Sequence, residues 1–340
     1  MPILTRRRRG ARRYAGGIDL DTTEVRLAIL SRGGSHAASV RVEWFGAAPL
    51  EPAWQGGAAP AEREAAASAL ARLVDAWPGR HGARAVSYAM ALPGSAVFRA
   101  LVPAARHPAM TMTAAALSDA ALPAMEPLVR AQAERVTGFP GDTLALDWSL
   151  GHPVGVMSAG ASSHAVGDPS LMIAAAQRQW VEMRVEVAAA AGVVLDAVDA
   201  EPLAACRALC RAAALERQEG DAYAAVWIGA DGFYAWRVEH GTPADEIHCA
   251  AGGDPVAALR GLSGSRALAR AIVAGDLDRL EGYGLTLADI GDALGCTVST
   301  FDCAAFVDGS VRGQFPHACG QPRAAAFAVA FGLALRGEAP

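Results

Sequence analysis

The fold is decided by the stretch Gly16-Gly17-Ile18-Asp19-Leu20-Asp21-Thr22-Thr23-Glu24-Val25-Arg26-Leu27-Ala28-Ile29-Leu30. It predicts an apolar strand, a tight polar turn at residues 21–23, and a second strand in which apolar and polar side chains alternate. A hairpin of this kind can direct the N–H and hydroxyl groups of its turn at a phosphate, or it can simply be the first hairpin of a sheet. The rest of the chain has to decide between these two interpretations.

Composition excludes several classes of protein. The chain has 340 residues, of which 52% are hydrophobic and 19% charged, with a net charge of −5, so it can form two domains with large cores and is not a general nucleic-acid binder. No window holds the roughly 18–20 apolar residues of a membrane-spanning helix. The arginine-rich N-terminus has no apolar stretch after it and does not resemble a secretory signal. We therefore expect a cytoplasmic protein with reduced cysteines, and their spacing predicts no metal site.

Periodicity predicts a mixed chain in which strands and helices alternate. Beyond the first hairpin, strands are predicted at 39–45, 85–92, 97–102, 143–150, 152–161, 171–176, 193–198, 247–251 and 296–301. Helices are predicted at 62–77, 114–122, 128–136, 177–191, from a turn at 199–205 to about 215, at 256–274 with a break near 261–264, at 285–294 and at 324–335. Gly192 is the expected C-terminal cap of the helix at 177–191.

A second strand–turn–strand at residues 224–238 repeats the layout of the first hairpin. With the strand-to-helix turn at 199–205 and the helix at 328–335, four segments stand in an order that resembles the actin/Hsp70-type ATPase superfamily. In that superfamily two related lobes each contribute a hairpin that grips nucleotide phosphates. The resemblance implies the same role for the two hairpins here.

Four further stretches narrow the resemblance to the PilM family, the cytoplasmic actin-like proteins of type IV pilus assembly and DNA uptake. They are Ala133–Pro140, which resembles a Glu-Ala-Glu-Arg-then-Pro segment of the family, the helix Val181–Val193, the Gly-Gly segment at Ala250–Asp254, and the C-terminal Phe331–Arg336. The likeness covers residues 14–337 in order.

The resemblance implies an α/β, actin-like two-lobed fold with a small α+β insert in the first lobe. We expect a disordered basic tail at 1–13, lobe 1 at 14–102 plus 170–220, an inserted subdomain at 103–169, lobe 2 at 221–323, and a C-terminal helical segment at 324–340. The segment between Gly253 and Gly275 is much shorter than in the family. We therefore expect the upper subdomain of lobe 2 to be largely missing.

The implied nucleotide cleft departs from the family pattern. Its expected residues are Asp19, Asp21, Thr22, Thr23, Glu201, Gly229, Ala230, Gly252, Gly253 and Gly275. Asp21 stands where the family has glycine, and a carboxylate there repels phosphate. Trp227 stands where the family has the aspartate that helps to hold the metal and its water, and an indole ring cannot do this. We therefore expect a cleft that has lost its ATPase activity, with no catalytic residue and no bound ATP or Mg²⁺.

The resemblance also implies a partner. PilM proteins bind the cytoplasmic N-terminal tail of the inner-membrane protein PilN in a groove beside the inserted subdomain. Here that groove would include Val97, Arg99, Leu101, Glu134, Phe139, Pro140, Leu146 and Trp148. An adaptor of this kind would meet other pilus platform proteins, bind no nucleic acid and lie at the inner membrane only indirectly.

Two alternatives stay open. One is a working ATPase of the same fold, and the other is the actin-like cytoplasmic domain of a type II secretion platform protein. The second is disfavoured because those proteins carry a transmembrane helix after this domain.

Overall fold

The computed structural model describes residues 13–32, 40–81, 86–103, 122–151, 170–215, 222–263, 267–307 and 323–336. The predicted tail, the strand at 152–161 and nearly all of the helix at 114–122 lie outside these residues. In the part of the chain that is described, no helix is both long enough and apolar enough to cross a bilayer.

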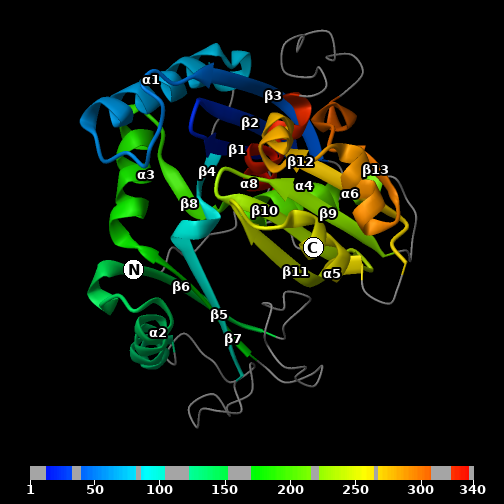
Figure 1. The fold of residues 1–340 in the computed structure, drawn as a ribbon. Helices are drawn as coiled ribbons and strands as arrows, with labels where there is room; N and C mark the ends of the chain where they lie inside the picture. Colours follow the sequence, from blue (N-terminus) through cyan, green and yellow to red (C-terminus); the bar gives the residue numbers. More distant parts are fainter. Residues whose placement is uncertain are drawn as a thin grey trace.

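Lobe 1 is built on a five-stranded sheet with the order β3-β2-β1-β4-β8 (Figure 1). The strands are β1 (Arg13–Leu20), β2 (Glu24–Arg32), β3 (Val40–Pro49), β4 (Val86–Leu92) and β8 (Leu195–Ala200). The first three form an antiparallel meander, while β4 runs parallel to both β1 and β8. The helices α1 (Pro60–Ala76) and α3 (Arg178–Ala190) pack together over one face. The opening hairpin is confirmed, and Gly192 follows α3 with a φ of +75°.

Lobe 2 repeats this layout in a sheet of order β11-β10-β9-β12-β13. Its strands are β9 (Tyr223–Ile228), β10 (Gly232–Glu239), β11 (Thr242–Ala250), β12 (Arg270–Gly275) and β13 (Thr297–Thr300), with α5 (Pro255–Ser263) and α6 (Leu287–Leu294) on one face. The predicted helix at 256–274 is wrong in its second half. Residues 270–275 are the interior strand β12, because this apolar run is buried on both faces of the sheet and lies between β9 and β13.

Two helices join the lobes. The helices α4 (Glu201–Leu215) and α8 (Ala328–Ala334), the second preceded by the short α7 (Arg323–Ala326), lie between the two sheets and share one apolar core with both. They touch backbone to backbone at Gly332, where an added Cβ would lie 1.8 Å from the Ala204 carbonyl oxygen. Gly17 likewise allows β1 and α8 to approach closely, since a Cβ there would lie 1.9 Å from the Ala330 carbonyl oxygen. Glycine is required at both positions for the close approach.

The inserted unit is a three-stranded antiparallel sheet of order β5-β7-β6 with one helix over it. It contains β5 (Val97–Pro103), β6 (Leu144–Gly151), β7 (Ser170–Gln177) and α2 (Leu122–Thr137). We expected β5 and β7 to belong to lobe 1, but both pair inside this sheet. The unit therefore extends beyond the expected limits at residues 103 and 169. In Figure 1 the inserted unit lies below the two lobes.

Candidate functional site

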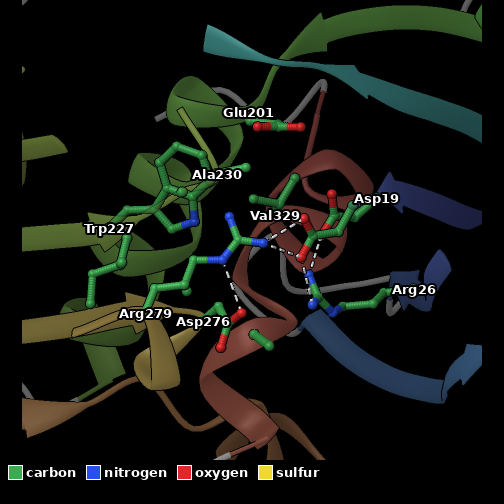
Figure 2. Close-up of a pocket in the computed structure, with 13 residues that line it drawn as sticks. Asp19, Arg26, Glu201, Trp227, Ala230, Asp276, Arg279 and Val329 are labelled. Carbon is green, nitrogen blue, oxygen red and sulfur yellow. Dashed lines mark hydrogen bonds and ion pairs between the residues drawn. The ribbon is translucent and has the colours of Figure 1, made fainter. Parts of the chain in front are cut away.

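The cleft between the lobes holds a small cavity beside the turn of the first hairpin (Figure 2). Its volume is about 20 Å³, which is room for about one water molecule. The lining residues come from both lobes and from the C-terminal helices: Asp19, Asp21, Arg26, Glu201, Trp227, Ile228, Gly229, Ala230, Gly275, Asp276, Arg279, Ala326 and Val329. In this conformation the cavity has no room for a nucleotide.

Arg26 fills the lobe 1 side of the cavity. It stands opposite Asp19 in the register of β1 and β2 and donates to three carboxylates, at 2.9 Å to Asp19, 2.9 Å to Asp21 and 2.6 Å to Glu24. Its side chain is 8% exposed, so the cluster is nearly removed from water. Burial raises the pKa of Asp19 to about 6, with Arg26 acting against this shift. Charged side chains of the protein itself therefore occupy the space beside the turn that would face a phosphate.

Arg279 enters the same space from lobe 2. It belongs to η7 (Leu277–Tyr283), a 3-10 helix that follows β12. Its Nη2 atom lies 2.9 Å and 3.2 Å from the two carboxylate oxygens of Asp21, and its Nε atom lies 3.0 Å from Asp276. Figure 2 shows the Arg26 and Arg279 side chains extending into the cavity from opposite sides, with Asp276 beside Arg279.

Aromatic side chains form the lobe 2 wall. Trp227 is 4% exposed, and its ring lies 5.3 Å from that of Tyr234, the residue opposite it in β10. Tyr234 in turn stacks on Trp236 and on His248. An indole ring donates one hydrogen bond and offers no metal ligand, so this wall holds no group that could coordinate Mg²⁺ at position 227.

Glu201 and Arg184 are buried ionisable side chains near the cleft. Burial, together with the nearby carboxylates of Asp19 and Asp231, raises the pKa of Glu201 well above its usual range. Arg184 donates to the Ala91 carbonyl at 3.0 Å and lies over the Trp54 ring, at 4.8 Å from its centroid. Burial lowers its pKa to about 10. The carboxylates around the cavity therefore outnumber the cations, which disfavours a phosphate there.

Six of the ten predicted cleft residues line this cavity. They are Asp19, Asp21, Glu201, Gly229, Ala230 and Gly275. Thr22 lies beside it and contacts Arg279, whereas the exposed Thr23 uses its carbonyl to accept from Leu50. Gly252 and Gly253 lie at the exposed turn after β11, away from the lining.

Sequence reasoning missed the two arginines, although a signal was present for one of them. Arg26 stands among three acidic residues, Asp19, Asp21 and Glu24, so an ion pair within the hairpin could have been proposed. Arg279 gave no local signal, because its partner Asp21 is 258 residues away.

The predicted groove residues divide between the two faces of the inserted sheet. Phe139, Leu146 and Trp148 pack on the α2 face, where the rings of Phe139 and Phe98 are 6.2 Å apart. Glu134 accepts from the Gly141 N–H at 2.7 Å and so stabilises the turn around Pro140. By the alternation of β5, the side chains of Val97, Arg99 and Leu101 lie on the opposite face. The structure does not bring all eight residues into one groove.

The face away from α2, which we call the open face, is partly exposed and carries apolar side chains beside the charged Arg99 and Asp147. In the strand register Leu101 lies beside Met172, and Met172 is 47% exposed. Arg99 reaches from this face to Glu246 on β11 and forms an ion pair with it. The open face therefore lies toward lobe 2, and the Arg99–Glu246 ion pair joins the two.

In the part of the chain that the structure describes, β5 is an edge strand, and no described strand pairs with the backbone groups on its outer edge. The Val97 N–H donates to the Gly94 carbonyl and not to β7, so by the alternation of an antiparallel pair the N–H groups of Arg99 and Leu101 also point to the outer edge. Pro103, which has no N–H, falls in the same register, as expected at an edge. On the other edge strand the Trp148 N–H is already taken by the Asp147 carboxylate at 2.9 Å.

Two lobes of the same sheet order, two facing hairpins and two central helices define an actin-like fold. The model of the family described as "Type IV pilus assembly protein PilM" matches residues 17–234, and the chain belongs to this family. No curated protein matches the chain.

The chain is similar to several solved structures, and the first of the three below shares its fold. A structure of a PilM-PilN type IV pilus biogenesis complex is 20% identical and matches with a TM-score of 0.65 over 96% of this chain and 99% of that chain. The ethanolamine utilization protein EutJ from Carboxydothermus hydrogenoformans is 14% identical, with a TM-score of 0.43 over 95% and 90% of the two chains. The cytoplasmic domain of EpsL, an inner-membrane component of the type II secretion system of Vibrio cholerae, is 10% identical, with a TM-score of 0.38 over 77% and 82%.

Proposed function

We propose that this protein is a type IV pilus assembly adaptor that binds the cytoplasmic N-terminal tail of a PilN-like inner-membrane protein and does not hydrolyse ATP. It would act in the cytoplasm, reach the inner membrane through this partner and meet other platform proteins there. Family membership supports the pathway. The structure of similar fold is a PilM-PilN complex, which supports the choice of partner.

The proposal that the protein does not hydrolyse ATP rests on the side chains that fill the cleft. Asp21 and Trp227 replace the expected glycine and aspartate, and two arginines occupy the space beside the turn. Phosphoryl transfer needs a metal-held phosphate and a positioned water. A cavity of about 20 Å³ offers neither. The loss of an upper lobe 2 subdomain, which stays a prediction, would remove adenosine contacts as well.

The inserted sheet supports an extended tail as the ligand. An extended peptide binds well where an exposed sheet edge supplies backbone hydrogen bonds and a neighbouring face supplies pockets for alternate side chains. The outer edge of β5, with the N–H groups of Arg99 and Leu101, and the exposed Met172 beside it fit this mode. In this proposal the groove consists of Val97, Arg99, Leu101 and Met172, and the residues on the α2 face support it from behind.

Fluorescence anisotropy with a labelled N-terminal tail peptide of the PilN-like protein tests the partner. We expect binding, and we expect Met172→Lys to weaken it at least about tenfold because it places a charge on an apolar contact surface. Val136→Lys is the matched control, since Val136 is similarly exposed, at 42%, but lies on α2. Equal affinities of the two variants would place the tail elsewhere, and no binding at high micromolar peptide would contradict the adaptor role.

Isothermal calorimetry with Mg·ATP tests the cleft. We expect no heat of binding. A micromolar dissociation constant would contradict the proposal and favour the alternative of an ATP-binding PilM-like protein.

A further inference from the structure

One ion pair crosses the cleft between the lobes. Asp21 lies in the turn between β1 and β2 of lobe 1, and Arg279 lies in η7 of lobe 2. The Arg279 Nη2 atom approaches both carboxylate oxygens of Asp21, at 2.9 Å and 3.2 Å, and the Thr22 hydroxyl at 3.4 Å. The contact is partly buried, with the two side chains 11% and 23% exposed.

Both partners of this pair are held in place within their own lobes. Asp21 also accepts from Arg26 at 2.9 Å, and Asp276 accepts from the Arg279 Nε atom at 3.0 Å. Burial acts to raise the pKa of Asp21, but the guanidinium groups of Arg26 and Arg279 outweigh this and hold it below its ordinary value. A fixed, ionised pair loses little side-chain entropy when the lobes meet.

Other polar contacts also join lobe 2 to the rest of the described chain, and two of them involve Ser95 and Arg99. The Asp231 carboxylate accepts from the Ser95 N–H at 2.6 Å, and Arg99 of the inserted unit pairs with Glu246 of β11. Both lie away from the cavity lining, whereas Asp21 and Arg279 are part of it. The Asp21–Arg279 pair is therefore the contact that bridges the cavity itself.

We propose that the Asp21–Arg279 pair is a latch that keeps the two lobes closed without a ligand between them. A ligand bound between two lobes favours the closed state by touching both. Here the protein's own side chains touch across the cleft, so closure is intrinsic. The closed state then depends on ionic strength and on these two residues. This inference does not require the adaptor role, because it concerns the free protein.

Hydrogen–deuterium exchange on the full chain tests the latch. In Arg279→Gln, which leaves the Asp21–Arg26 pair in place, we expect exchange in residues 20–24 and 276–284 to speed up at least about tenfold, because each segment loses its contact in the other lobe. Asp21→Asn should act on the same two segments, and more strongly on residues 20–24 because it also weakens the contact with Arg26. The double variant should exceed Asp21→Asn by little, since both single variants remove the same contact across the cleft. In 1 M NaCl the unsubstituted protein should shift in the same direction.

Arg130→Gln is the matched control, because Arg130 pairs with Glu126 inside α2 and does not join two lobes. It should leave exchange at residues 20–24 and 276–284 unchanged. The proposal is overturned if Arg279→Gln leaves both segments protected. It is equally overturned if exchange rises by the same factor throughout both lobes, or if the effects of Asp21→Asn and Arg279→Gln add fully in the double variant.

Discussion

The β1–β2 and β9–β10 hairpins share one backbone layout but carry opposite chemistry at the same position. In each hairpin the second cross-strand pair from the turn faces the cleft. In lobe 1 this pair is Asp19 with Arg26, and in lobe 2 it is Trp227 with Tyr234. Each hairpin also runs beside a parallel strand, β4 or β12. The layout has been kept in both lobes while the side chains differ.

The difference between the two hairpins shows which features the fold requires and which a bound ligand would require. Lobe 1 keeps a buried charged cluster, in which one guanidinium serves three carboxylates. Lobe 2 has aromatic packing, with Trp227, Tyr234 and Trp236 in the core that joins the lobes. Either solution fills the cleft wall, so a hairpin of this fold does not require a nucleotide. The two solutions should respond differently to charge removal, pH and loss of a single hydrogen bond.

Arg26→Ala should produce the largest loss of stability. It leaves Asp19 and its acidic neighbours buried without their shared cation, and breaking a buried ion pair in this way costs about 3–5 kcal/mol. We expect the free energy of unfolding, measured by urea denaturation, to fall by this amount.

Glu186→Ala is the control for Arg26→Ala, because it removes an exposed ion pair and leaves the hydrogen bonds of Arg63 to the Gly57 and Ala58 carbonyls in place. Arg63 lies 3.9 Å from Glu186, and these side chains are 32% and 67% exposed. An exposed pair contributes about 0–1 kcal/mol. A loss below about 1 kcal/mol for Arg26→Ala would mean that the charged cluster contributes little to stability. The lobe 1 hairpin would then not depend on its charges, contrary to the contrast drawn above.

The pH dependence of stability gives the next largest effect, and it arises from Asp19 in lobe 1. The ordinary pKa of aspartate is 3.8, and burial raises that of Asp19 to about 6. Between these values the folded protein binds more protons than the unfolded chain, so the free energy of unfolding falls as the pH rises through this window. Asp19→Asn removes this contribution, which is about 3 kcal/mol at 1.36 kcal/mol per pKa unit.

Urea denaturation at several pH values between 4 and 6.5 measures this slope. We compare slopes because Asp19→Asn also weakens the contact with Arg26, which lowers stability at every pH. Equal slopes for the variant and the unsubstituted protein would show that Asp19 does not titrate in this window.

The sequence predicted the features that rest on local patterns. Both hairpins and the glycine after α3 follow from residues that are neighbours in the chain, so periodicity and turn chemistry were sufficient. The departures at Asp21 and Trp227 follow from the family resemblance, because they are differences from the pattern that it implies. The resemblance then supplied the order of the lobes. Most of the cleft residues could therefore be chosen before their positions were known.

The features that were missed depend on distant partners. Residues 270–275 read as a helix because alanine favours helices, and their place between β9 and β13 decides otherwise. β5 and β7 join the inserted sheet because each pairs antiparallel with a neighbour there, which a linear boundary cannot show. Arg279 meets Asp21 only once both lobes are built.

Tyr234→Phe should have the smallest effect and completes the contrast. The Tyr234 hydroxyl donates to Asp231 at 3.1 Å, and its ring stacks on Trp236. The substitution removes one hydrogen bond and keeps the ring, so we expect a loss of about 1 kcal/mol by urea denaturation. The size of this loss should not change with salt if packing holds this hairpin. A loss above about 3 kcal/mol would mean that lobe 2, too, depends on a polar contact, because Asp231 also accepts from the Ser95 N–H across the interface.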